Sequence, residues 1–259
     1  MGSIQTDASK EEIKVLITGF APFKQDYPVN PSWEIVSSLP DYLPPIRPKT
    51  AAAPSSALLP PIRLLVHPEP IHVSYRTVRS LVPTLHSQKP DIVVHVGMAG
   101  PRAYYSIERR GHRDGYQMQD VDGKYLADYE DVNSDDWVWK DLPEEIETDF
   151  DCEDVLRKWK NYSPRYSDLR ISEDAGHYLC DFIYFSSLAE LYKKGKREGE
   201  GGGEGEVRKK VIFLHVPSDA SEGAVLRGRE LLLQLVRGVV ECELERKKDD
   251  SKEGEEGRE

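Results

Sequence analysis

Three short apolar runs constrain the fold of this chain more than any other feature of its sequence. They are IKVLITGF (13–20), DIVVHVG (91–97) and KVIFLHVP (210–217). Runs of this length and composition are typical of strands that are buried on both faces, as in a parallel sheet. Helical patterns separate them, so we predict an α/β fold: a single-domain, open, mainly parallel twisted sheet with helices on both faces.

Four segments have helical patterns. The segment 30–39 starts with Asn30 as a plausible N-cap, followed by a proline at the first helical position. The segment 74–88 must accommodate an internal proline. We interpret 173–193 as a long, mostly buried helix and 224–244 as an amphipathic closing helix.

The remaining segments have the composition of insertions and of a tail. We predict one domain over 1–245 with surface insertions at 44–61, 125–147 and 195–206. The first insertion is rich in proline and alanine, the second is acidic, and the third contains almost only glycine and charged residues. The end of the chain, 246–259, is charged and nearly free of apolar residues, so we expect a disordered tail.

The overall charge and the cysteines exclude several functional classes. The net charge is -11 and no Lys/Arg stripe alternates with aromatic residues, which argues against nucleic-acid binding. We find no secretory signal and no apolar run of the roughly 20 residues that span a bilayer, so we expect no membrane partner. Three widely spaced cysteines, Cys152, Cys180 and Cys242, form neither a disulfide framework nor a zinc site, and this favours the cytoplasm.

Residues that can do chemistry lie next to the predicted strands. In open α/β sheets, ligands bind beyond the carboxyl ends of the strands. TGFAPF follows the first run, GMAG follows the second, and His215 closes the third. Cys180 lies near a predicted helix start. Glycines at 19, 97 and 100 allow the backbone to turn tightly and to approach a ligand.

Cys180 and His215 are a candidate nucleophile and base. A thiolate is a nucleophile whose pKa falls at a helix N-terminus or beside an imidazolium, and imidazole titrates near neutral pH. The alternatives are a small buried cysteine and a core histidine whose nitrogens are satisfied. Glu108 is one of 46 acidic residues. For it, a solvated charge or an ion pair with Arg109 or Arg110 is the default.

Five segments carry a resemblance to a known family. They are VLITGFAPFKQDYPVNPSWEIV, PDIVVHVGMAG, SIERRGHRDGY, SEDAGHYLCDFIYFSSL and FLHVP. In this order they resemble the pyroglutamyl peptidase type I family, also called pyrrolidone-carboxylate peptidases. These are cysteine peptidases that remove an N-terminal pyroglutamyl residue from peptides. We expect a eukaryotic, fungal-type member.

The resemblance implies a site and a reaction. The triad would be Cys180 as nucleophile, His215 as base and Glu108 as the group that orients the histidine, with a thioester intermediate and with no metal or cofactor. The substrates would be peptides with N-terminal pyroglutamate, and backbone N–H groups near Cys180 would stabilise the oxyanion. The implied pocket for the uncharged lactam comprises Phe20, Phe23, Asn30, Gly97, Met98, Tyr178 and Leu179.

Some positions depart from the family pattern and leave alternatives open. Ala21 and Met98 replace a glycine and a glutamine of some members, and Arg109 is only a candidate for the arginine that assists the oxyanion in bacterial members. Core packing explains Phe20 and Phe23 as well, and helix capping explains Asn30. The alternatives are a related Cys-His-Glu amidohydrolase with another small acyl substrate, or a non-catalytic interaction protein. Oligomeric state is not predicted.

Overall fold

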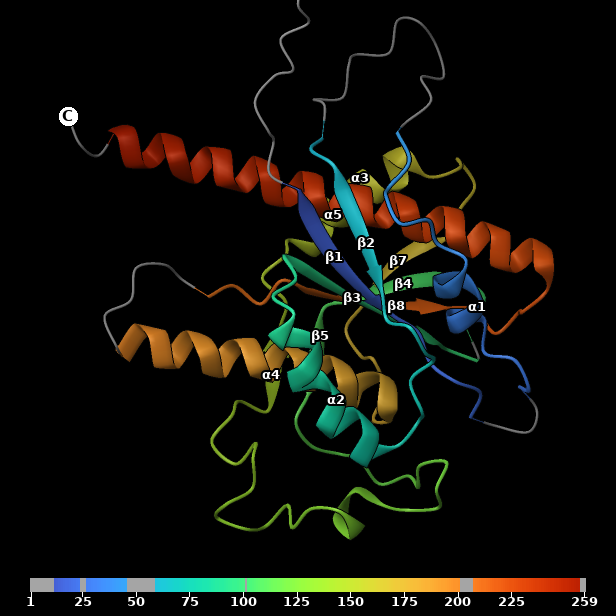
Figure 1. Ribbon diagram of the computed structural model, residues 1–259, viewed down its shortest axis with the longest axis vertical. Helices are drawn as coiled ribbons and strands as arrows, with labels where there is room; N and C mark the ends of the chain where they lie inside the picture. Colours follow the sequence, from blue (N-terminus) through green and yellow to red (C-terminus); the bar gives the residue numbers. More distant parts are fainter. Residues whose placement is uncertain (1–11, 24–26, 46–58, 101, 201–206, 257–259) are drawn as a thin grey trace, which may run out of the picture.

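A six-stranded sheet forms the centre of the molecule. The computed structural model describes residues 12–23, 27–45, 59–100, 102–200 and 207–256 (Figure 1). The strand order is β2-β1-β3-β8-β4-β7, and neighbours run parallel except that β4 is antiparallel to β8. The strands are β1 (Ile13–Thr18), β2 (Ile62–Val66), β3 (Ile92–Met98), β4 (Tyr105–Glu108), β7 (Leu169–Ser172) and β8 (Val211–Val216). The predicted α/β fold with a mainly parallel sheet is confirmed.

Helices cover both faces of the sheet (Figure 1). One face packs against α1 (Pro31–Ser37), α3 (Cys152–Tyr162) and α5 (Glu222–Glu256), and the other against α2 (Tyr75–Ser87) and α4 (Leu179–Glu200). A short antiparallel ribbon of β5 (Arg110–His112) and β6 (Glu145–Glu147) lies against α4. We call the two faces the α5 side and the α4 side.

The alternation of side chains along the strands decides which residues reach the α4 side. Successive side chains of a strand point to opposite faces. In β4, Tyr105 and Ile107 belong to the core of the α5 side, so Glu108 points to the α4 side. In β8, Leu214 belongs to the same core, so His215 also points to the α4 side. The two strands are neighbours, and their alternation therefore places an acid and a histidine on one face.

The sequence analysis does not identify β2, β4 and β7. These strands have only 4 or 5 residues, and polar residues interrupt each of them: exposed Arg63 in β2, exposed Arg170 in β7, and the buried Ser106 and Glu108 in β4. They therefore lack a continuous apolar run. Their strand conformation depends on pairing with longer neighbours, because β-propensity is set largely by cross-strand packing.

The helix α4 begins later than expected and extends further. It starts at Leu179 rather than at residue 173, because the preceding segment turns at Gly176, whose φ of 82° favours glycine. It continues to Glu200, so the predicted 195–206 insertion begins as helix. Residues 201–206 lie outside the described residues, as do residues 46–58 of the first predicted insertion.

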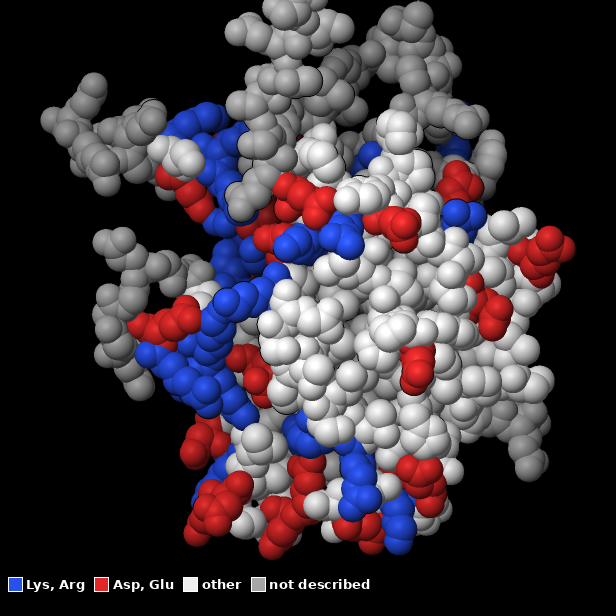
Figure 2. Space-filling view, viewed as in Figure 1, with Lys and Arg blue, Asp and Glu red and all other residues white. Residues whose placement is uncertain are grey.

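The charged end of the chain is helical to Glu256, which corrects the prediction of a disordered tail over this part. Arg246 pairs with Glu243 and Asp250, and Lys252 pairs with Asp249. Ion pairs at spacings of three and four residues stabilise a helix surface. Figure 2 shows charged residues of both signs gathered along the edge where α4 and α5 end.

The segment 125–147 contributes to the core and is not only a surface insertion. Leu126, Trp139, Leu142 and Ile146 are buried in the core of the α4 side. They follow no regular period, because the segment consists mainly of turns and the short helix η1 (Leu126–Asp128).

Among the helices in the described ranges, none is long and apolar enough to cross a bilayer.

Close packing of β5 on α4 predicts a stability effect at Gly111. A Cβ at Gly111 would lie 2.8 Å from the backbone nitrogen of Phe185. We expect Gly111→Ala to lower the free energy of unfolding by about 1–3 kcal/mol, because the backbone of α4 must shift. Urea unfolding followed by circular dichroism measures this change.

The matched control is Gly223→Ala in the first turn of α5. Within the described residues, no contact beyond its own helix and chain neighbours lies within 4 Å of a Cβ placed there. This change should be neutral or stabilise the protein by up to about 1 kcal/mol, since alanine has the higher helix propensity. Equal effects of the two substitutions would contradict the packing argument.

Candidate active site

Glu108 and His215 form a buried pair on the α4 side of the sheet. In the antiparallel register of β4 and β8, Ser106 pairs with His215 and Glu108 pairs with Phe213. The distance from Glu108 Oε1 to His215 Nδ1 is 2.7 Å, and both side chains are buried. Because a carboxylate accepts hydrogen bonds, Nδ1 carries the hydrogen and Nε2 of the neutral ring keeps a free lone pair.

The thiol of Cys180 lies over β3, beside this pair. Cys180 is the second residue of α4, and Gly97 of β3 pairs with His215 in the register of β3 and β8. A Cβ at Gly97 would lie 2.8 Å from Cys180 Sγ and 2.7 Å from Phe213 Cζ. The sulfur therefore occupies space that only a glycine leaves open. Gly97, expected in the pocket lining, instead makes room for the sulfur.

The environment of Cys180 favours the protonated thiol. The pKa of Cys180 is raised to about 12, mainly by burial and also by the carboxylates of Glu108 and Asp181, while Arg102 opposes the rise. The direction of this shift is opposite to the lowering that a helix start alone would give, and burial is its largest cause. For this thiol to act as a nucleophile, a base would have to remove its proton.

Glu108 is held as a carboxylate. Burial would raise the pKa of Glu108, but hydrogen bonding and charge from His215, with the charge of Arg102, lower it overall. The acid therefore stays ionised and holds the imidazole in one tautomer and one orientation.

Arg102 is a site residue that the sequence analysis missed. Its Nη1 lies 2.6 Å from Glu108 Oε1 and 2.8 Å from Ser106 Oγ, and its Nη2 donates to the Asp174 carbonyl oxygen at 2.8 Å. Asp174 belongs to the turn that leads to Cys180. Arg102 thus ties Glu108 to the segment that leads to Cys180. No spacing rule selects it: Arg102 lies in the connection between β3 and β4, six residues before Glu108.

Arg109 does not have the role considered for it. Its guanidinium pairs with Glu153 at 2.5 Å and with Glu173 at 2.8 Å, and both acids are exposed. These contacts tie the connection between β4 and β5 to neighbouring surface segments.

A pocket opens beside Cys180. It encloses about 230 Å³ of space between atoms, part of which is open to solvent. Every predicted pocket residue except Gly97 lines it, and Val73 is an addition that the sequence analysis did not identify. The lining residues are Phe20, Phe23, Asn30, Val73, Met98, Tyr178, Leu179 and Cys180. The walls are therefore apolar, with one side-chain amide.

Asn30 holds one wall of the pocket in place. Its Oδ1 accepts hydrogen bonds from the backbone nitrogen and the hydroxyl of Ser32, at 3.1 and 2.9 Å. Its Nδ2 donates to the Ala21 carbonyl oxygen at 3.0 Å, and Ser32 Oγ accepts from the Phe20 nitrogen at 3.1 Å. The capping role weighed for Asn30 is thus present. Its second Nδ2 hydrogen has no partner among the described residues.

These features define a class of protein. A thiol at a helix start, beside a buried imidazole–carboxylate pair and a small apolar pocket on an α/β sheet, is the constellation of a cysteine hydrolase. Solved structures with this fold include a variant of the pyrrolidone carboxyl peptidase of Pyrococcus furiosus, with a TM-score of 0.61 and 23% identity over 90% of this chain and 99% of that chain. The enzyme from Thermococcus litoralis has a TM-score of 0.62 at 19% identity, covering 88% and 94%.

Sequence comparisons give the family. The family model for pyroglutamyl peptidase matches residues 63–217. Pyroglutamyl-peptidase 1 of Homo sapiens and that of Mus musculus are each 33% identical over 204 residues, which is 78% of this chain and 78% of each relative. The pyrrolidone-carboxylate peptidase of Thermosipho africanus is 30% identical over 79% of this chain and 82% of its own length. This chain belongs to the pyroglutamyl peptidase family, and its fungal type stays a prediction.

The raised pKa of Cys180 predicts how the thiol reacts with iodoacetamide. The rate constant should rise through neutral and alkaline pH, approaching tenfold per pH unit, because only the thiolate is alkylated. Peptide mapping by mass spectrometry should find Cys180 modified before Cys152, which is fully buried, and before Cys242, which donates to Asp154. A rate that is flat through neutral pH would instead indicate a resting thiolate–imidazolium pair.

The contacts of Arg102 predict a role in positioning Glu108. We expect Arg102→Gln to lower kcat for a pyroglutamyl amide on the order of tenfold to a hundredfold, with little change in KM, because a misplaced imidazole slows proton transfer. Arg102 lowers the pKa of Glu108, so its loss should move the acid limb of the pH–rate profile to higher pH. Arg102→Lys should restore part of kcat.

Arg109→Gln is the matched control. It removes two ion pairs of the same kind outside the site, so kcat should stay unchanged. Equal kcat in Arg102→Gln and in the unmodified chain would rule out the positioning role.

Proposed function

We propose that this chain hydrolyses the amide bond after an N-terminal pyroglutamyl residue of peptides, with Cys180, His215 and Glu108 as its triad. The observation that carries the proposal is the small apolar pocket whose lining includes Cys180, next to the buried pair of His215 and Glu108. Membership of the pyroglutamyl peptidase family supports the same reaction.

The proposed reaction starts with a proton transfer. Nε2 of His215 takes the proton of the Cys180 thiol as the sulfur attacks the pyroglutamyl carbonyl carbon. The imidazolium then gives this proton to the leaving amine, the C–N bond breaks, and a thioester remains. His215 next takes a proton from water, whose oxygen attacks the thioester and releases pyroglutamate, and the proton returns to the sulfur. Glu108 stabilises the imidazolium in each step.

Backbone groups at the start of α4 are the proposed oxyanion donors. The first N–H groups of a helix have no helical partner and carry partial positive charge. Phe182 donates to the Tyr178 carbonyl oxygen at 2.9 Å, so the N–H groups of Leu179, Cys180 and Asp181 precede the first such bond. They lie next to the attacking sulfur, where negative charge develops on the carbonyl oxygen.

The pocket favours an uncharged lactam over related N-terminal residues. The rings of Phe23 and Tyr178 lie 6.1 Å apart, and the amide of Asn30 keeps one hydrogen for the lactam carbonyl. N-terminal proline, glutamate and glutamine bring an ammonium group instead. Burying an unpaired charge between apolar walls is costly, so these residues should be rejected.

A reducing compartment fits the three cysteines, all of which are free thiols. A disulfide at Cys180 would remove the nucleophile. We therefore propose that the enzyme works in the cytoplasm on peptides with N-terminal pyroglutamate.

A panel of coumarin amides tests the proposed function. The chain should release coumarin from the pyroglutamyl amide, and at least about a hundredfold more slowly from the prolyl and glutamyl amides, since burial of a charge costs several kcal/mol. Cys180→Ser should abolish turnover, because a hydroxyl is far harder to deprotonate than a thiol. Cys242→Ser, which keeps a donor toward Asp154, is the matched control and should retain full activity.

Two results would contradict different parts of the proposal. Activity that survives Cys180→Ser would refute the nucleophile. Equal cleavage of all amides would leave the triad in place but refute the specificity of the pocket.

A further inference from the structure

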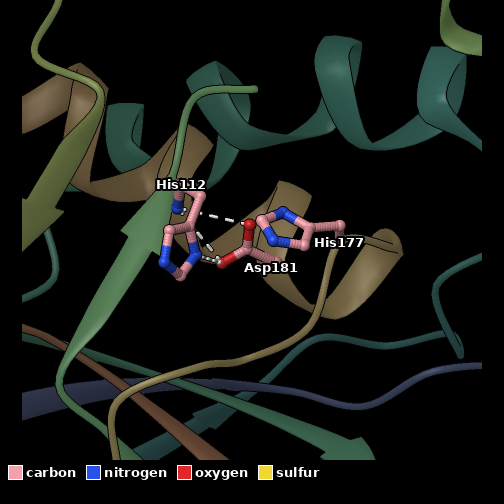
Figure 3. A group of neighbouring side chains, drawn as sticks. All are labelled: His112, His177 and Asp181. Atoms are coloured by element: carbon pink, nitrogen blue, oxygen red, sulfur yellow. Dashed lines mark hydrogen bonds and ion pairs between the residues drawn. The ribbon is translucent and has the colours of Figure 1, made fainter. Parts of the chain in front are cut away.

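Two histidines and an aspartate converge from separate segments beside the site described above. His112 comes from β5, His177 from the turn before α4, and Asp181 from the first turn of α4 (Figure 3). One ligand atom of each residue lies within 4.8 Å of the other two. Asp181 is fully buried, His112 is partly buried and His177 is exposed. The reaction proposed above uses none of these side chains.

The hydrogen bonding of His177 suits a metal ligand. Its Nδ1 lies 3.1 Å from the Asp114 carbonyl oxygen, which can only accept, so Nδ1 carries the hydrogen. The lone pair is therefore on Nε2. Metal-bound histidines commonly donate their other ring N–H to a carbonyl or carboxylate oxygen, which fixes the tautomer and the ring orientation.

His112 and Asp181 are spaced as ligands of one ion. The distance from His112 Nδ1 to Asp181 Oδ1 is 3.2 Å. Ligand atoms of a tetrahedral zinc ion, with bonds of about 2.0–2.2 Å, lie roughly 3.3–3.5 Å apart. The other ring nitrogen of His112 lies 3.8 Å from Glu145 Oε1, so an acid faces it from the side away from Asp181.

The buried carboxylate of Asp181 shares one of its hydrogen-bond donors, the Tyr116 hydroxyl, with another acceptor. The His112 backbone N–H lies 3.2 Å from both carboxylate oxygens, and the Tyr116 hydroxyl lies 2.9 Å from Oδ2. That hydroxyl also contacts the His112 carbonyl oxygen. Tyr116 has one hydrogen for these two acceptors. A cation on Asp181 would supply the attraction that the shared hydroxyl does not.

We propose that His112, His177 and Asp181 bind a divalent metal ion of the zinc class. Two imidazoles and a carboxylate favour zinc, cobalt or nickel over magnesium or calcium, which prefer ligands that are all oxygen. Exposure of His177 leaves a fourth position that water can fill. A bound ion would clamp the turn before α4 to β5. This turn leads directly to Tyr178 of the pocket.

The test uses the full-length chain with Cys180→Ser and no affinity tag, so that the thiol beside His215 binds no metal. Calorimetric titration with Zn²⁺ should show one ion per chain. Titration with Co²⁺ should give visible d–d absorption without a thiolate charge-transfer band. Zn²⁺ should also raise the Tm of this protein.

His177→Gln, placed in this background, is the decisive variant, because the side chain is exposed and its loss should leave the fold intact. It should weaken Zn²⁺ binding at least tenfold and abolish the rise in Tm, and His112→Gln should weaken binding to a similar degree. His72→Gln is the matched control: His72 pairs with Asp122 at 2.8 Å on the surface and belongs to no three-ligand group among the described residues. The His72→Gln variant should bind Zn²⁺ with the same affinity as the background protein.

Three outcomes would overturn the proposal. These are the absence of Zn²⁺ binding, binding that His177→Gln leaves intact, and a thiolate band with Co²⁺, which would place the ion on Cys152 or Cys242. None of them bears on pyroglutamyl hydrolysis, so the two proposals fail or stand separately.

Discussion

The hydrogen bond between Glu108 and His215 is the interaction around which the site is built. It exists because β4 runs antiparallel to β8 in an otherwise parallel sheet, with a register that sets both side chains on the α4 side. A buried carboxylate needs compensation, and His215, Ser106 and Arg102 all bond to the same oxygen, Oε1. Because Arg102 also holds the turn before α4, Glu108, His215 and the segment that leads to Cys180 are positioned together.

The second constraint on the site is the space available for the Cys180 side chain. The sulfur of Cys180 fits against β3 only because Gly97 has no side chain, and the same strand ends at Met98, which lines the pocket. Burial raises the pKa of the thiol, so it stays protonated in the free site, and the proposed reaction requires His215 to take the proton. The pocket and Cys180 are therefore packed together. Hydrogen bonds among Phe20, Asn30 and Ser32 hold the opposite wall of the pocket.

Sequence reasoning reached parts of the site for different reasons. Cys180 and His215 stood out because each interrupts an apolar pattern, whereas Glu108 required the family resemblance, since nothing in its spacing separates it from other acids. His95 shows that the sequence pattern of a strand does not by itself tell a catalytic histidine from a structural one. It too lies on a central strand and faces the α4 side, yet Thr18 and Ser187 bond both of its ring nitrogens at 2.8 and 2.7 Å, and burial lowers its pKa to about 3. Neighbours from distant segments make His95 structural, whereas His215 pairs with Glu108 and is the base that we propose.

The sequence by itself determined the fold class, the three long strands, the helix that carries the nucleophile and most of the pocket lining, because local apolar periodicity and family motifs are written along the chain. Tertiary structure alone decided the contacts of Arg102, the space at Gly97, the burial of Trp139 and the meeting of His112 with His177 and Asp181. Many of these contacts join residues far apart in sequence, such as Arg102 with Asp174 and His112 with Asp181. No local pattern encodes such distances, because they arise only when the whole sheet and its helices pack together.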